Sequence, residues 1–266
     1  GVGLVAVTKS GTTAFSPDGE EWHLGSVPGE LLDVTYGDGL WVAVGGESGT
    51  FFAPGAIYTS TDGVNWNTAC ANGNCPDSGY PYHACAYGDG LFIAGTEYTQ
   101  YPVSYSTDGQ SWADGITDEN INPHLAQIYA IGLYFTAGDR NAPGVAYTED
   151  PINGDFTHPN NPVPIGALAS DGTVVVGAGL EGPSYTTDGS NWAQTDTFAA
   201  ETVAYDPATG KWCAAGLSGA AYLSDDAQSW NSAQTGVSAD FQAACAYPGG
   251  GPQLFWMAKQ GVREAT

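Results

Sequence analysis

Carboxylates are the most abundant side chains in this sequence that could do chemistry, because 29 of its 266 residues are Asp or Glu. Two carboxylates at a suitable separation can hydrolyse a glycosidic bond. With so many acids some such pair is inevitable, so their abundance does not indicate an enzyme. The periodic placement of five aspartates in one motif indicates a structural role instead. These five are Asp18, Asp62, Asp108, Asp188 and Asp226.

The sequence predicts neither a metal site nor a cofactor. The four histidines lie singly, and no compact Cys/His spacing of a zinc site is present. Calcium favours a loop with alternating carboxylates, which the isolated turns of this chain offer only weakly.

The repeated motif, here called the box, reads Ser/Thr-x-Asp-Gly-x-x-Trp. Its complete copies are Ser16–Trp22, Ser60–Trp66, Ser106–Trp112 and Thr186–Trp192. A fifth copy, Ser224–Trp230, has Ala227 in place of glycine, and a sixth, Thr148–Phe156, is stretched and lacks tryptophan. Short polar side chains can accept backbone N–H bonds in a tight turn, and glycine supplies a positive φ. We expect the tryptophan to begin the next strand and to fill apolar space between sheets.

The spacing of the boxes predicts a β-propeller. Their closing aromatic residues are 44, 46, 44, 36 and 38 residues apart, which is the repeat length of a propeller blade. Thirty-eight glycines, sixteen prolines and one methionine favour short strands and turns. We therefore expect an all-β chain of four-stranded antiparallel blades, with the box between the third and fourth strands. For the second blade the predicted strands are Leu32–Tyr36, Leu40–Val44, Ala56–Ser60 and Asn65–Thr68.

The number of blades is predicted as seven, with six as the alternative. The first segment begins at a second strand, Leu4–Val7, and the last segment contains another, Leu254–Ala258. One blade cannot use both, which favours seven, although the first blade then lacks an innermost strand. In either case residues 1–266 are expected to form a single propeller domain.

The box and its period resemble those of the BNR or Asp-box repeat proteins, a β-propeller superfamily that includes sialidases, some lectins and many bacterial and phage proteins. The family box usually reads Ser-x-Asp-x-Gly-x-Thr-Trp, so the copies here are one residue shorter. The resemblance covers nearly the whole chain. Sialidases hold the substrate carboxylate with three arginines, and this chain has two, Arg140 and Arg263. The resemblance therefore implies the sialidase-like fold without the sialidase arginine triad, and we expect a protein that is not an enzyme.

The net charge of −24 excludes one class of partner. Five basic residues cannot form the stripe that neutralises nucleic-acid phosphates. An anionic membrane surface would also repel the chain. The sequence has no transmembrane run, so membrane insertion is not predicted. The charge fits an acidic extracellular protein kept soluble by it, or a halophilic or marine origin.

The five cysteines divide into two groups. Cys70 and Cys75 enclose a short polar loop and can form a disulfide in an oxidising compartment. Cys85, Cys213 and Cys245 lie in apolar strands and are predicted to be buried.

Recognition is predicted on the ends of the blades opposite the box. In a four-stranded meander, the connections that enter the first strand and join the second to the third emerge together there. The candidate binding residues in these connections are Phe51, Phe52, Tyr80, Tyr82, Tyr98, Tyr101, Asp139 and Arg140. The alternative is that the tyrosines pack against their own blade. The structural box residues are the five aspartates with Trp22, Trp66, Trp112, Trp192 and Trp230.

Two hypotheses about function follow. The first is a non-catalytic interaction or structural module displayed on a virion, as a capsid decoration, turret or tail component, or on another extracellular surface. Its partners would be proteins of a larger assembly. The alternative is a lectin-like propeller that binds a host-surface glycan, and a glycoside hydrolase is a distant third.

Overall fold

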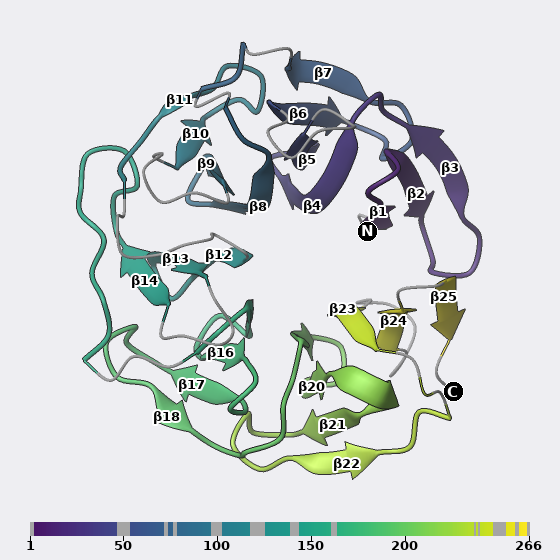
Figure 1. Cartoon of the computed structure of the whole chain (residues 1–266), viewed down its shortest axis with the longest axis vertical. Coiled ribbons are helices and arrows are strands. Elements are labelled where there is room, and N and C mark those ends of the chain that lie inside the picture. Colours follow the sequence, from purple (N-terminus) through teal and green to yellow (C-terminus); the bar gives the residue numbers. More distant parts are fainter. Residues whose placement is uncertain are drawn as a thin grey trace. The chain divides into compact units, whose positions relative to one another are not determined.

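The computed structural model describes residues 3–46, 54–71, 74–76, 79–96, 103–117, 126–138, 144–160, 164–236, 238, 240–246, 254–258 and 261–264. Side chains are described as far as residue 241. Within these residues the strands form seven antiparallel sheets, and neighbours in each sheet follow one another along the chain (Figure 1).

Four sheets have four strands and three have three. The first three sheets contain β1 (Leu4–Val7), β2 (Thr12–Ser16) and β3 (His23–Ser26); β4 (Glu30–Gly37), β5 (Leu40–Gly46), β6 (Gly55–Ser60) and β7 (Asn67–Cys70); and β8 (Tyr82–Gly88), β9 (Leu91–Thr96), β10 (Ser104–Ser106) and β11 (Ala113–Asp114). The next two contain β12 (Ala126–Ala130), β13 (Leu133–Ala137) and β14 (Val145–Thr148); and β15 (Ala167–Ser170), β16 (Val175–Ala178), β17 (Ser184–Thr186) and β18 (Ala193–Gln194). The last two contain β19 (Thr202–Asp206), β20 (Lys211–Ala215), the 3-10 turn η1 (Leu217–Gly219), β21 (Ala221–Ser224) and β22 (Asn231–Ala233); and β23 (Phe241–Ala246), β24 (Leu254–Ala258) and β25 (Gly261–Glu264).

The all-β prediction is confirmed, and the predicted strands of the second blade match β4 to β7 within two residues at each end. The two end segments of the chain form separate three-stranded sheets, β1–β2–β3 and β23–β24–β25. Because three of the described sheets have three strands rather than four, the choice between seven and six blades stays a prediction.

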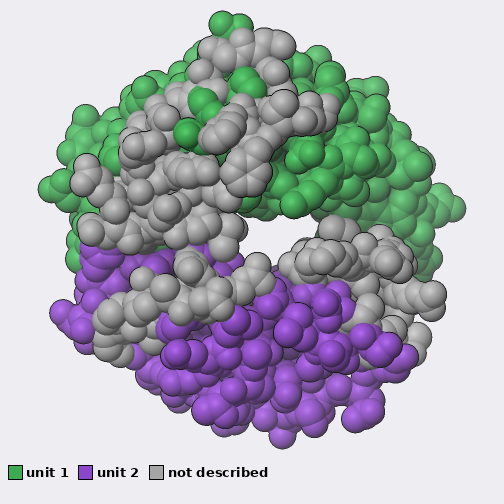
Figure 2. All heavy atoms as spheres, in the orientation of Figure 1, with its two compact units in different colours: residues 1–136, 147–157 green, residues 137–146, 158–266 purple. Residues whose placement is uncertain are grey.

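The chain divides into two compact units. Unit 1 comprises Gly1–Thr136 and Tyr147–Thr157, and unit 2 comprises Ala137–Ala146 and His158–Thr266 (Figure 2). The expectation of a single domain over residues 1–266 stays a prediction.

In the four-stranded sheets the box lies at one end, between the third and fourth strands, and this end is called the box end below. In the first sheet the box lies between β2 and β3, and the stretched sixth copy follows β14. In the four-stranded sheets the hairpin between the first and second strands also turns at the box end. In the second and third sheets its tip is an Asp-Gly pair with positive φ at both residues, 47° and 77° at Asp38 and Gly39 and 47° and 76° at Asp89 and Gly90. Two successive positive φ angles define the type I′ turn that matches the strand twist. The opposite end, where the second strand connects to the third, is called the box-free end.

Neighbouring sheets of unit 1 pack a tyrosine against a glycine. The ring of Tyr87 in β8 covers Gly37 in β4, and a Cβ placed on Gly37 would lie 2.0 Å from the ring. Tyr129 in β12 covers Gly88 in β8 with the same 2.0 Å approach. Tyr36 holds the corresponding position in β4 and is 36% exposed. The described first sheet begins at a strand equivalent to β5, so it has no equivalent of β4 to carry such a glycine.

In unit 1, two residues have buried side-chain polar atoms without a hydrogen-bond partner among the described residues, Thr13 and Gln127. Thr13 in β2 is 0% exposed, and its hydroxyl has no hydrogen-bond partner in the described part of the chain. Three residues before the next box serine, β6 has the apolar Ile57 instead. Burying a hydroxyl without a partner costs about 1–3 kcal/mol.

We therefore expect the substitution Thr13→Val to raise the free energy of unfolding by about 1 kcal/mol, because valine has the same shape without the hydroxyl. Urea denaturation at fixed pH measures this. The matched control is Thr12→Val, since Thr12 is half-buried and its hydroxyl contacts that of Ser10 at 3.2 Å. A Thr13→Val protein no more stable than the Thr12→Val protein would contradict the expectation.

Candidate functional site

The box carboxylates are saturated with hydrogen bonds from their own turn. Asp62 accepts the backbone N–H groups of Val64 at 2.9 Å and Asn65 at 2.7 Å, the Asn65 side-chain amide at 2.8 Å and the Ser60 hydroxyl at 3.0 Å. The Ser60 hydroxyl in turn accepts the N–H of Gly63 at 2.8 Å. The Asn65 amide, followed by the two backbone N–H groups, lowers the pKa of Asp62 far below its usual value.

The same network recurs in the other boxes. Oδ1 of each box aspartate accepts two backbone N–H groups, and the pKa of each is lowered. The acceptors are Asp18, Asp108, Asp188 and Asp226. The stretched sixth copy keeps it through Asp150, which accepts the N–H groups of Ile152 and Asn153. Carboxylates with a low pKa are poor general acids, so these groups hold turns rather than transfer protons.

The box tryptophans also bond within their turns, with one exception. The indole N–H groups of Trp22, Trp66, Trp112 and Trp192 donate to the carbonyl of the box glycine at 3.0–3.2 Å. In the fifth box Ala227 keeps the positive φ, at 63°, and Trp230 donates to the Thr195 hydroxyl at 3.2 Å. Trp230 thus joins its sheet to the segment that follows β18.

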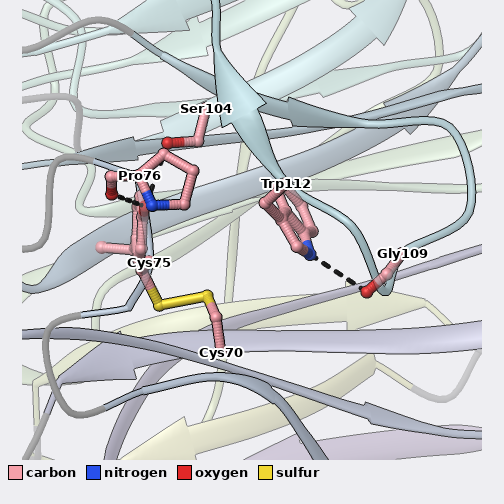
Figure 3. The surroundings of a disulfide bond; sticks show 7 residues. Cys70, Cys75, Pro76, Ser104, Gly109 and Trp112 are labelled. Atoms are coloured by element: carbon pink, nitrogen blue, oxygen red, sulfur yellow. Dashed lines mark hydrogen bonds between the residues drawn. A yellow bond between two sulfur atoms is a disulfide. The ribbon is translucent and has the colours of Figure 1, made fainter.

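At the box-free end of unit 1, a disulfide closes the start of the connection from β7 to β8. Cys70 ends β7 and is bonded to Cys75, with 5.1 Å between the Cα atoms (Figure 3). Cys75 is buried in the apolar cluster that also holds Val44 and Ile57. The sequence allowed this bridge, and the structure forms it. Of the other cysteines, Cys85 and Cys213 are buried as predicted, whereas the Cys245 side chain lies outside the description.

Tyr82 fixes the other end of this connection. Its hydroxyl donates to the carbonyl of Pro76, directly after the disulfide, and lies 3.0 Å from the Ser104 hydroxyl. Tyr82 is the first residue of β8. It is 0% exposed because its ring packs over Gly55. The prediction of Tyr82 as a binding residue is therefore corrected. The ring belongs to the core because Tyr82 is a strand residue and not a loop residue. Successive side chains of a strand point to opposite faces of the sheet, and that of Tyr82 points to the buried face.

Two described side chains of this connection lie outside the core, those of Tyr80 and Asn74. Tyr80 is half-buried and follows the exposed Gly79. Asn74 lies inside the disulfide loop with its side chain exposed, and its backbone N–H donates to the carbonyl of Ala71 at 3.1 Å. Sequence reasoning did not select Asn74 as a binding residue, although its place between the two bridged cysteines was a usable signal.

Of the other predicted binding residues, the structure describes none. Phe51, Phe52, Tyr98, Tyr101, Asp139 and Arg140 lie outside the described residues. The structure therefore describes two predicted binding residues, Tyr80 and Tyr82, both at the box-free end, and of these only Tyr80 is not fully buried.

We expect the disulfide to stabilise unit 1. Closing a loop with a sequence separation of 5 removes chain entropy worth roughly 2 kcal/mol from the unfolded state. The free energy of unfolding of the double variant Cys70→Ala/Cys75→Ala should therefore be lower by that amount, and its urea midpoint should be lower as well. A reducing agent should shift the unfolding midpoint of the unsubstituted protein and leave that of the double variant unchanged. Equal midpoints for the two oxidised proteins would contradict this role.

In unit 2 the box-free end of the sixth sheet presents one apolar side chain on a fixed turn. Leu217 is 49% exposed in η1, and Ser218 has a positive φ of 57°. Asp240 accepts the N–H of Ser218 at 2.9 Å, and Thr235 donates to the carbonyl of Gly219 at 2.8 Å. Sequence reasoning did not select Leu217 as a binding residue, although a leucine in a short glycine-flanked turn is a usable signal for an exposed apolar side chain.

The described residues contain no group of three or more His, Cys, Asp or Glu side chains that could hold a metal ion. Within the same residues, no helix is long and apolar enough to cross a membrane. The described box-free ends carry a polar, an aromatic and an apolar side chain outside the core, those of Asn74, Tyr80 and Leu217. At the box ends the aspartate carboxylates are already hydrogen-bonded to backbone N–H groups.

Comparisons with known proteins place the fold. No protein-family model matches the chain, and no curated protein matches it. Among solved structures, the WD40 repeats of RRP9 align with a TM-score of 0.71 at 10% identity, over 98% of this chain and 85% of that one. The Pan2 WD40 domain of Neurospora crassa aligns with a TM-score of 0.71 at 12% identity, over 100% and 88%. YCF48, in a structure bound to D1 peptide, aligns with a TM-score of 0.61 at 16% identity, over 89% and 81%.

The chain has the β-propeller fold. At 10–16% identity the likeness shows the fold alone, because propellers carry many functions. The prediction of a propeller from the box period is confirmed, and the resemblance to the Asp-box repeat proteins stays a prediction.

Proposed function

We propose that this chain is a non-catalytic interaction module, displayed on a virion or another extracellular surface, that binds a protein partner through a box-free end. The observation that carries the proposal is the anchored connection between β7 and β8. The Cys70–Cys75 disulfide fixes its first half, and the Tyr82 hydroxyl fixes the carbonyl of Pro76. A recognition segment held on a rigid scaffold loses less conformational entropy when it binds.

The disulfide also supports the proposed location. Structural disulfides persist in oxidising surroundings, such as the outside of cells and virion surfaces. The net charge of −24 favours solubility and disfavours adhesion to anionic membranes and nucleic acid.

The box supports a non-catalytic role. Its carboxylates are the most regularly placed acids of the chain, and each holds the backbone of its own turn. YCF48 shares the fold and is seen with a bound peptide, so the scaffold can present a surface to a polypeptide. For this chain we place that surface at Asn74 and Tyr80 in unit 1, and Leu217 in unit 2 is a separate candidate contact.

Site-specific cross-linking tests the proposal. A photo-reactive amino acid replaces the exposed Asn74 at the box-free end, and a control replaces the exposed Glu20 in the first box. In virions or surface fractions purified from the native source, position 74 should form one discrete adduct with a protein and position 20 should form none.

Equal labelling at both positions, or labelling at position 20 alone, would contradict the placement of the surface. A discrete adduct with a glycan at position 74 would replace the protein-binding function by the lectin-like alternative. Hydrolysis of an aryl glycoside that depends on one carboxylate of the chain would overturn the non-catalytic assignment.

A further inference from the structure

Asp33 is an acidic residue that lies in a strand and does not belong to a box turn. It lies in β4, next to a register shift between Leu31 and Asp33 where one extra residue bulges from the pairing with β5. Its carboxylate accepts the N–H of Val34 at 2.8 Å and, across to the neighbouring sheet, the N–H of Cys85 in β8 at 2.9 Å. The residue as a whole is half-buried, whereas its carboxyl group is withdrawn from solvent.

The strands that pack against β4 are largely apolar, and the described residues around Asp33 include no cation paired with it. β5, its pairing partner, has no ionisable side chain between Leu40 and Gly46, and β1 on the other side of β4 has none between Leu4 and Val7. Within the described residues, Asp33 forms no ion pair with a lysine, arginine or histidine. The ionisable residues of β8 are Tyr82, His83, Cys85 and Tyr87, of which Cys85 makes the contact.

The thiol of Cys85 also faces the Asp33 carboxyl group. It lies 3.7 Å from the carbonyl of Val42, and burial, followed by the negative charge of Asp33, raises its pKa well above the usual value. The thiol is therefore neutral at every pH considered below. On the side of β4 itself, Glu30 begins the strand and Tyr36 lies near its end.

Removal from water disfavours the charged form of the Asp33 carboxyl group more than its two N–H bonds favour it. Burial thus raises the pKa of Asp33 to about 6, against 3.8 for an exposed aspartate. The box aspartates, which are exposed and accept N–H bonds, move in the opposite direction. Asp33 is consequently protonated in mildly acidic solution, in which the box carboxylates stay charged.

We propose that protonation of the Asp33 carboxyl group removes the cost of burying its charge between the sheets β4–β7 and β8–β11, so that unit 1 is more stable in mildly acidic solution than at neutral pH. The hydrogen bond from Cys85 to Asp33 lies close to the candidate binding surface. Cys85 follows Tyr82 by three residues in β8, and Tyr82 anchors the connection that carries Tyr80. Acidification therefore stabilises the scaffold on which this surface is built.

The sign follows from proton binding. Between pH 3.8 and about 6 the folded state binds a proton at Asp33 and the unfolded state does not. Stability from this group is therefore fully present below pH 3.8 and is lost as the pH rises through about 6. The difference of about two pKa units corresponds to roughly a hundredfold change in the unfolding equilibrium constant.

The test is urea denaturation between about pH 4.5 and pH 7.5 of the unsubstituted protein, Asp33→Asn and the control Asp38→Asn. Asp38 is exposed on the turn after the same strand and has a positive φ that asparagine adopts readily. The ratio of unfolding constants between Asp33→Asn and the unsubstituted protein should change by tens of fold over this range. The ratio for Asp38→Asn should stay constant within about twofold.

Nuclear magnetic resonance provides a second measurement that needs no substitution. The backbone amide signals of Val34 and Cys85 should titrate together with a midpoint near pH 6, because both N–H groups donate to this carboxylate. A common midpoint near that of an exposed aspartate, about pH 4, would overturn the proposal. An Asp33→Asn ratio as constant as that of Asp38→Asn would overturn it as well.

Discussion

Replacing Gly37 by alanine is expected to lower the free energy of unfolding of unit 1 by about 3 kcal/mol. A Cβ at this position would lie 2.0 Å from the Tyr87 ring, at which distance either the ring or β4 must move. Inserting atoms into a packed interface costs about 1–3 kcal/mol, and the closeness of this approach places the effect at the upper limit. Urea denaturation at a fixed pH gives the value directly.

Two further variants separate the steric clash from other effects of losing a glycine. Gly39 lies two residues later with open space around its Cβ position and a φ of 77°, so Gly39→Asn should cost little. In the double variant Gly37→Ala/Tyr87→Leu, the two losses should not add, because the smaller side chain makes room for the methyl group. Strict additivity would show that the Tyr87 ring is not what Gly37 accommodates.

Replacing Tyr82 by alanine is expected to cost about 4 kcal/mol and to release the connection between β7 and β8. The substitution removes a fully buried aromatic ring and leaves the Pro76 carbonyl and the Ser104 hydroxyl without their partner. Tyr82→Phe keeps the ring and removes the hydroxyl, so its cost should be about 1 kcal/mol.

Tyr80→Ala is the comparison that distinguishes the core from the binding surface. Tyr80 is half-buried, and its loss should change stability by less than about 1 kcal/mol while weakening the binding of a partner at the box-free end. Thermal unfolding and partner binding measured on the same samples check both statements. A Tyr82→Ala protein as stable as Tyr80→Ala would place the Tyr82 ring outside the core.

The fold was predictable because the box repeats. A serine or threonine, an aspartate and a glycine at fixed spacing specify one turn, and four complete and two altered copies at blade spacing specify a set of similar sheets. The strands of the second blade could be placed from the Tyr36-Gly-Asp-Gly turn and the box after Ser60, since each signal fixes one end of a strand. The box aspartates could be assigned to turns for the same reason.

The candidate site was less predictable because it depends on side-chain direction and on contacts between sheets. Tyr80 and Tyr82 are alike in sequence, but Tyr82 begins β8 and is buried there, whereas Tyr80 stays in the connection. Asp33 lies in an apolar strand with no signal that Cys85, 52 residues later, donates to it. The turn that exposes Leu217 is fixed by Asp240, which comes from a later segment of the chain.

The structure of the chain within its native complex tests most directly the claim that a box-free end binds the partner while the box ends hold their own turns. We predict that the partner covers Asn74 and Tyr80 in unit 1, while the carboxylates of Asp62 and Asp188 at the box ends stay on their own backbone N–H groups. A partner or ligand that contacts these box carboxylates and leaves Asn74 and Tyr80 uncovered would contradict the account.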